Sequence, residues 1–315
     1  ICNFKIKLTR KLYIELIFLV ILGALTSLSL PPLNYFIINF FTYTLFFYFL
    51  IEKSNKLNNK KLFFIYGWIF GFGYFSTNLY WISISLTFDQ NYKFLIPLTI
   101  FLIPSFLALF YGLISFIFLT YKPRNVLSSL LWFSLIFGII EFVRGTILTG
   151  FPWNLIAYSF SNQLEFIRVI SVIGTYGFNL FCILMFTCPG ILLIKYTNRS
   201  IIFNISIFFI VILFFFYGSM YKKKFDNTVD KNLDYKIRVI GSQIGLEKFY
   251  SEVDPVVIIR DLIKISKPDL NDKTIFIWPE GIVPDITQRG LVEYKWLFEE
   301  NFNENHLFII GINSQ

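Results

Sequence analysis

The chain has 315 residues, of which 56% are hydrophobic and 21% aromatic, and its formal net charge is +8. This composition is too apolar for a protein built only of ordinary soluble domains, which hold roughly 45–50% apolar residues. Residues 1–221 carry 15 lysines and arginines against 5 acids, whereas the remainder carries 13 against 15. The basic excess therefore belongs to the loops of an apolar region, which argues against nucleic-acid binding.

Seven apolar stretches are predicted to cross a bilayer as helices, because about 20 apolar residues span its hydrocarbon core. They cover about residues 12–30, 33–51, 62–88, 94–121, 125–149, 169–194 and 200–217. They do not alternate polar and apolar residues, as strands of a membrane barrel would. The sequence therefore predicts a polytopic helical membrane bundle over residues 1–221.

The basic residues outside these stretches predict an orientation. Twelve lie before the first stretch or after the second, fourth and sixth, and therefore on one side of the membrane. The positive-inside rule places that side in the cytoplasm, so seven spans put the C-terminal segment outside. Lys222, Lys223 and Lys224 oppose this rule locally.

The segment 222–315 has the pattern of a soluble α/β domain. Strands are predicted over 236–244, 274–278 and 307–312, with a helix after Asp254 and another over 291–303. This β-α-β-α-β order predicts a mostly parallel sheet. Three strands are fewer than the 5–6 of a typical sheet, so only the N-terminal part of such a domain is expected.

Glu280 is the strongest candidate for a reactive group. It follows the predicted strand 274–278 and lies between two prolines, Pro279 and Pro284. Ligands of α/β sheets bind beyond the carboxyl ends of the strands, where a carboxylate among apolar neighbours suits a general base. A capping or solvated loop acid is the alternative interpretation.

Two features of the membrane region are further candidates. Glu141 and Arg144 share one face of the fifth stretch, where charges are costly and suggest either a functional site or an interior salt bridge. The segment 150–154 follows on the outer side, and Trp81 is expected on that side too. Their rings indicate either an interfacial belt or the wall of a cleft open to lipid.

Several motifs together resemble the apolipoprotein N-acyltransferases, bacterial inner-membrane enzymes with a nitrilase-like (carbon-nitrogen hydrolase) periplasmic domain. The motifs are Leu28–Pro32, Trp81, Glu141–Gly145, Thr149–Trp153, Tyr158–Ser159 and Trp278–Glu280. The resemblance extends over essentially the whole chain, and it implies multi-pass insertion with residues 222–315 in the periplasm.

The resemblance also implies an activity and a set of site residues. The family transfers a phospholipid acyl chain to a cysteine thiol, and then to the amine of a lipoprotein's diacylglyceryl-cysteine. Glu280 matches the base of its Glu-Lys-Cys triad, and no cofactor or metal is implied. The residues expected to contact substrate are Trp81, Glu141, Arg144, Phe151, Pro152, Trp153, Tyr158 and Phe249.

The chain ends at Gln315, before the positions where the family has its lysine and cysteine. Cys2, Cys182 and Cys188 lie in or beside the first and sixth stretches and are not expected to replace that cysteine. The expectation is therefore a fragment, or one part of a split protein whose remainder is a separate chain. The alternatives are a membrane fragment that binds lipid or a partner without catalysis, and a transporter, for which the sequence offers no matching repeat.

Overall fold

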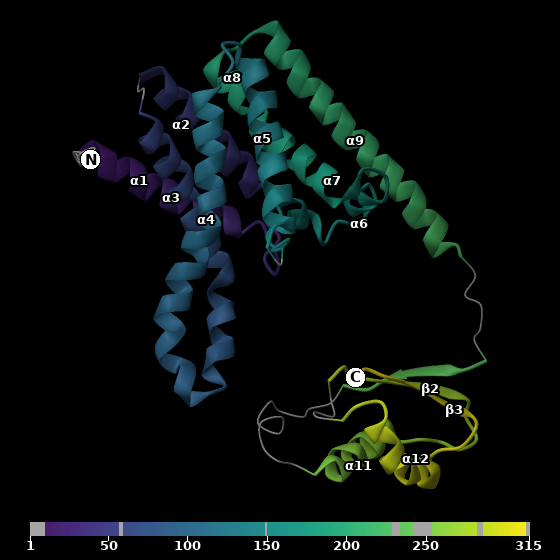
Figure 1. The fold of residues 1–315 in the computed structure, drawn as a ribbon. Helices are drawn as coiled ribbons and strands as arrows, with labels where there is room; N and C mark the ends of the chain where they lie inside the picture. The colour runs from purple at the N-terminus through teal and green to yellow at the C-terminus, as the bar shows by residue number, and fades with distance from the viewer. Residues whose placement is uncertain are drawn as a thin grey trace. The chain divides into compact units, whose positions relative to one another are not determined.

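The computed structural model describes residues 10–56, 59–148, 150–228, 234–241, 254–281 and 286–312. The chain divides into two compact units, Ile1–Thr228 and Val229–Gln315 (Figure 1). The first unit is helical and the second combines helices with a small sheet.

The first unit contains an α-helix within each of the seven stretches that the sequence predicts to be spans. They are α1 (Arg10–Ser27), α2 (Ile38–Lys56), α3 (Lys60–Leu79), α4 (Ile96–Thr120), α5 (Val126–Thr146), α7 (Ile170–Thr187), α8 (Gly190–Ile194) and α9 (Asn198–Asp226), with the short α6 (Leu164–Ile167). Three of them begin at a polar cap, because Asn59, Asn125 and Thr197 accept hydrogen bonds from the first turns of α3, α5 and α9.

Among the described residues, four helical stretches are long and apolar enough to cross a membrane: Gln90–Thr120, Val126–Thr146, Ile170–Ile194 and Asn198–Asp226. Helices α1, α2 and α3 occupy the positions of the other three expected spans. Within its 18 residues α1 includes Arg10, Lys11 and Glu15, so it is less apolar than the four.

The third expected span differs from a continuous α-helix. The stretch 62–88 stays α-helical only to Leu79 and continues as the 3-10 helix η1 (Tyr80–Thr87). Thr77 and Asn78 bond back to the carbonyls of Gly73 and Tyr74, and such bonds compete with regular helix geometry. A second 3-10 helix, η2 (Gln90–Leu95), then leads into α4, and this end of the α3–α4 pair projects beyond the other helices (Figure 1).

The core of the first unit is aromatic. Phe46 of α2 stacks on Phe70 of α3 with ring centroids 4.0 Å apart, and Phe133 of α5 packs edge-on against Phe46. Gly71 brings α3 against α4, since a Cβ there would lie 2.7 Å from the Cβ of Tyr111. Small residues allow this close helix packing where lipid supplies no hydrophobic driving force.

The second unit contains the expected parallel sheet. Strands β1 (Lys236–Val239), β2 (Thr274–Trp278) and β3 (His306–Ile310) pair in that order, and both pairs are parallel. Helix α11 (Pro255–Ser266) connects β1 to β2. The predicted helix 291–303 is the 3-10 helix η4 (Gly290–Tyr294) followed by α12 (Lys295–Asn301), and it connects β2 to β3.

Among the described residues of the second unit, one face of this sheet is packed and the other carries exposed aliphatic side chains. Phe276 and Trp278 are buried with Ile259 and Leu262 of α11, and the Trp278 indole donates to the Ser266 hydroxyl at 3.0 Å. Helices α11 and α12 lie on that face (Figure 1). The side chains exposed on β1 and β3 include Ile237, Val239, Leu307 and Ile309. Parallel sheets are normally covered on both faces, so these exposed aliphatic side chains are unusual for such a sheet.

Candidate functional site

The segment after α5, residues 150–158, folds back over the end of that helix. Gly150 has φ +77° and its amide donates to the Ile147 carbonyl at 2.8 Å. A Cβ at Gly150 would lie 2.7 Å from the Gly145 carbonyl oxygen, so both the backbone angle and the available space favour glycine. We call this segment the 150–158 loop.

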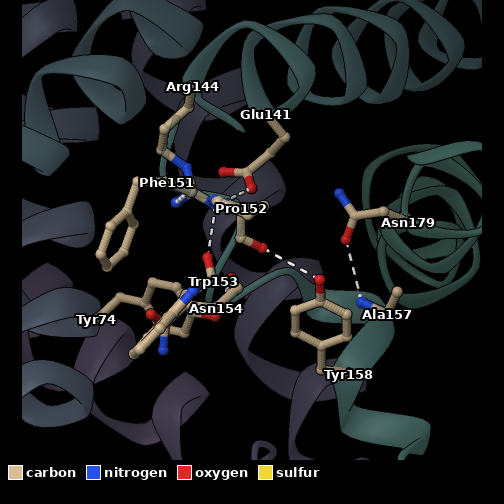
Figure 2. Close-up of polar contacts among 10 residues, drawn as sticks. All are labelled: Tyr74, Glu141, Arg144, Phe151, Pro152, Trp153, Asn154, Ala157, Tyr158 and Asn179. Atoms are coloured by element: carbon tan, nitrogen blue, oxygen red, sulfur yellow. Dashed lines mark hydrogen bonds and ion pairs between the residues drawn. The ribbon is translucent and has the colours of Figure 1, made fainter. Parts of the chain in front are cut away.

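Arg144 holds the first half of the loop through its carbonyl groups. Its guanidinium donates to the Phe151 carbonyl at 2.8 Å and to the Trp153 carbonyl at 3.0 Å (Figure 2). It also pairs with Glu141 one turn earlier on α5, at 2.5 Å. Both side chains are buried. The pair therefore positions the loop backbone and is not directed at solvent.

The environment of this pair leaves part of its hydrogen-bonding capacity unused. Glu141 Oε1 and Arg144 Nε have no hydrogen-bond partner within the described part of the chain. The guanidinium lies over the Phe75 ring, 5.4 Å from its centroid. Burying two charges is costly and is tolerated when each compensates the other. Removing either residue would therefore leave the other as an uncompensated buried charge.

Two residues that are not among the sequence-predicted candidates hold the second half of the loop. The Tyr74 hydroxyl of α3 donates to the Asn154 carbonyl at 2.8 Å, and the Asn179 side chain of α7 accepts from the Ala157 amide at 3.0 Å (Figure 2). Asn154 itself has φ +58°, which asparagine tolerates better than most residues. The sequence could have identified Asn179 as a candidate, because a polar residue inside an uncharged apolar stretch indicates a specific role.

Removing one of these supports should loosen the loop measurably. Tyr74→Phe deletes only the hydroxyl that reaches Asn154, and we expect it to lower the free energy of unfolding by about 1 kcal/mol. Reversible unfolding in mixed micelles, followed by tryptophan fluorescence, measures the change. The matched control is Tyr80→Phe, because Tyr80 is exposed. Equal losses in the two variants would contradict the supporting role of Tyr74.

The aromatic side chains of the loop form one wall of a cavity of about 940 Å³. Trp153 stacks on Trp81 of η1, with ring centroids 5.4 Å apart and planes 14° from parallel. Tyr158 also lines this cavity, together with the end of α1 and the segment 27–33. The structure thus brings together three of the expected substrate-binding residues, from parts of the chain distant in sequence.

The Tyr158 hydroxyl donates to the Pro152 carbonyl at 3.2 Å. Burial raises the pKa of this phenol above its ordinary value, so it remains a neutral donor at physiological pH. Pro152 is exposed, and its main contribution here is the carbonyl that accepts this bond. The cavity wall is therefore apolar with neutral hydrogen-bonding groups, which suits an uncharged chain better than an ion.

A second, smaller cavity of about 380 Å³ lies between α4 and the end of α5. Phe151 and Arg144 line it, with apolar side chains that include Phe106 and Phe110 of α4. Phe151 contacts Trp153, with ring centroids 5.7 Å apart. The 150–158 loop therefore contributes to two cavities.

The second unit places Glu280 in the turn after β2, at the carboxyl end of the parallel sheet. The Gly281 amide donates to the Gly311 carbonyl at 3.2 Å, which links this turn to the end of β3. A Cβ at Gly311 would lie 2.7 Å from the Glu280 Cα, so the two turns touch. Glu280 is exposed, whereas the sequence suggested enclosure by apolar neighbours. Residues 282–285, which follow it, lie outside the described residues.

The remaining candidates are not part of these arrangements. Phe249 and Cys2 lie outside the described residues. Cys182 is buried in α7 and Cys188 is buried at the C-terminal end of that helix. Neither thiol is placed where a water-borne or lipid substrate reaches it in the first unit.

The chain is similar in sequence to known proteins across the region that contains these cavities. The family profile described as the apolipoprotein N-acyltransferase N-terminal domain matches residues 22–188. That range contains Trp81, the Glu141–Arg144 pair and the 150–158 loop.

Curated relatives extend the match into the second unit. An apolipoprotein N-acyltransferase of Brucella melitensis is 26% identical over 281 residues, covering 84% of this chain and 51% of the relative. One of Rhodopseudomonas palustris is 28% identical, over 85% of this chain and 51% of the relative. One of Rickettsia prowazekii is 28% identical, over 87% and 54%. The chain thus spans about half the length of these relatives.

Proposed function

Because the chain belongs to the apolipoprotein N-acyltransferase family, we propose that it acts in the N-acylation of bacterial lipoproteins. In this proposal a phospholipid donates an acyl chain, and the N-terminal amine of a diacylglyceryl-cysteine lipoprotein accepts it. No nucleotide is needed, because the phospholipid ester is itself an activated acyl donor.

The proposed membrane arrangement has seven crossings, formed by α1 to α5, α7 with α8, and α9. The N-terminus lies in the cytoplasm of an inner membrane, and the second unit lies in the periplasm as the start of a nitrilase-like domain. The distribution of lysine and arginine supports this orientation. It brings the 150–158 loop to the outer side, where both lipid substrates are found.

The observation that carries the proposal is the aromatic cavity formed by Trp81, Trp153 and Tyr158. Moving an acyl chain from lipid to water costs about 0.8 kcal/mol per CH₂. A cavity built into the helical bundle spares the enzyme that cost, because the chain passes from one apolar environment to another. In this role the Glu141–Arg144 pair is a positioning element that fixes the loop.

The proposed chemistry follows the two-step logic of covalent catalysis. A cysteine thiol loses its proton to Glu280, and the thiolate attacks the phospholipid ester to give a thioester. Glu280 returns the proton to the departing alkoxide, which leaves as a lysophospholipid. The lipoprotein amine then attacks the thioester, giving an amide and restoring the thiol. The cysteine, and the lysine that stabilises each oxyanion, come from the family resemblance and are assigned to no residue of this chain.

A second candidate function is lipid binding without acyl transfer. The buried positions of Cys182 and Cys188 favour it for this chain taken alone. In that case acyl transfer requires residues supplied from elsewhere, for example by a separate chain.

Membranes carrying the protein expressed from its own gene distinguish the two functions. They are incubated with a diacylglyceryl-cysteine lipopeptide and phosphatidylethanolamine bearing a radiolabelled acyl chain, and the triacylated product is measured. The acyltransferase proposal expects labelled product, and less of it from Trp153→Ala. Binding of the phospholipid with no labelled lipopeptide would overturn it in favour of the binding function.

A further inference from the structure

A third cavity, of about 790 Å³, lies in the first unit between α9 and the α6–α7 segment. Gly218 lines it and lets α9 approach α6 closely, because a Cβ there would lie 2.7 Å from the Glu165 Cα. Beyond that contact the two elements leave a groove, which we call the α9 groove. It is separate in its lining residues from both cavities described above.

The walls of the α9 groove are mainly apolar. Leu164 and Ile167 come from α6, Ile170 begins α7, and Phe225 comes from the last turn of α9. Leu164 and Phe225 are 62% and 79% exposed. Both α7 and α9 belong to stretches apolar enough to cross a membrane, so the groove adjoins the region that lipid occupies.

Three cationic side chains also line the groove: Arg168, Lys222 and Lys224. Lys222 pairs with Glu165 at 2.9 Å, and this hydrogen bond lowers the pKa of the Glu165 carboxyl, which therefore stays ionised at neutral pH. The Arg168 guanidinium lies 4.3 Å from the centroid of the Tyr221 ring. Within the described residues neither Arg168 nor Lys224 forms an ion pair. The groove thus holds a cationic excess even with Glu165 included.

We propose that the α9 groove binds an anionic phospholipid, with the phosphate at Arg168 and Lys224 and an acyl chain along Leu164 and Phe225. Charge complementarity favours an anionic headgroup, since basic clusters beside spanning helices attract acidic lipids. The apolar walls favour a lipid over a soluble phosphate, which would gain nothing from them. The proposal also accounts for Lys222 and Lys224, which oppose the positive-inside rule in the orientation proposed above.

Adjacent lysines provide a matched test, because Lys224 lines the groove and Lys223 is not among its lining residues. The full chain in dodecyl-maltoside micelles is titrated with phosphatidylglycerol, and lipid-bound protein is counted by native mass spectrometry. Each basic contact is worth about five-fold in affinity, so Lys224→Gln should weaken binding about five-fold. Arg168→Gln should do the same, and Lys223→Gln should leave the affinity nearly unchanged.

Two further arms distinguish a lipid site from a general basic surface and from a site for free phosphate. Phe225→Gln should weaken phosphatidylglycerol binding more than Phe216→Gln, because Phe225 lines the groove and Phe216 is an exposed residue of the same helix. Equal effects of Lys223→Gln and Lys224→Gln would overturn the proposal in favour of general attraction to the membrane. Phosphatidylcholine binding as tightly, or full displacement of phosphatidylglycerol by inorganic phosphate, would also overturn it.

Discussion

Glu280→Gln is expected to reduce lipoprotein acylation by roughly 10²–10⁴-fold, the range that general acid–base groups contribute. The glutamine keeps the shape of the side chain but cannot take a proton from the thiol or the amine. The measurement is the rate of triacyl-lipopeptide formation by membranes carrying the protein expressed from its own gene.

Because Glu280 is exposed, this substitution is expected to change activity without unfolding the second unit. Exposed substitutions usually change stability by no more than about 0.5 kcal/mol. Protection of the Gly281 amide, which bonds the Gly311 carbonyl, should therefore persist in hydrogen exchange. Glu293→Gln is the control, because Glu293 is an exposed acid of η4 in the same unit. A Glu280→Gln variant with near-normal acylation would refute Glu280 as the base.

Arg144→Met is expected to destabilise the first unit by about 3–5 kcal/mol, the cost of leaving one member of a buried ion pair without its partner. The change strands the Glu141 carboxylate inside the bundle and removes the donors of the Phe151 and Trp153 carbonyls. Unfolding in mixed micelles measures the stability, and hydrogen exchange of the 150–158 loop measures the local effect.

Two further variants show whether the ion pair is responsible. Glu141→Gln combined with Arg144→Met removes the stranded charge, so it should be more stable than Arg144→Met alone. Arg144→Lys keeps the charge but loses the planar fork that reaches several acceptors, so it should be intermediate. Arg199→Met is the control, because Arg199 is exposed at the start of α9. If Arg144→Met were as stable as Arg199→Met, the positioning role of Arg144 would be refuted.

Much of the fold follows from local patterns in the sequence. Long apolar runs predict the helices of the first unit, and alternating strand and helix signals predict the parallel sheet of the second. Glu280 could be located at the carboxyl end of β2 because the apolar strand ends at Trp278 and Pro279 follows it. These properties depend on residues close together in the chain, so one sequence is enough to find them.

The candidate site depends on contacts between distant segments. Glu141 and Arg144 could be paired from their spacing, but the bonds from Arg144 to the loop carbonyls depend on how the chain turns back at Gly150. Tyr74 reaches Asn154 across 80 residues, and the stacking of Trp81 on Trp153 depends on the end of α3 at Leu79.

The sequence by itself therefore determined which segments are apolar helices, which are strands, and which charged residues are unusual for their position. Only the tertiary structure decided that the buried arginine serves the loop backbone, that the aromatic rings enclose a cavity, and that Glu280 is exposed. The physical reason is that hydropathy and turn chemistry are properties of neighbouring residues. Hydrogen-bond partners, cavities and burial instead arise from how helices and strands pack against one another.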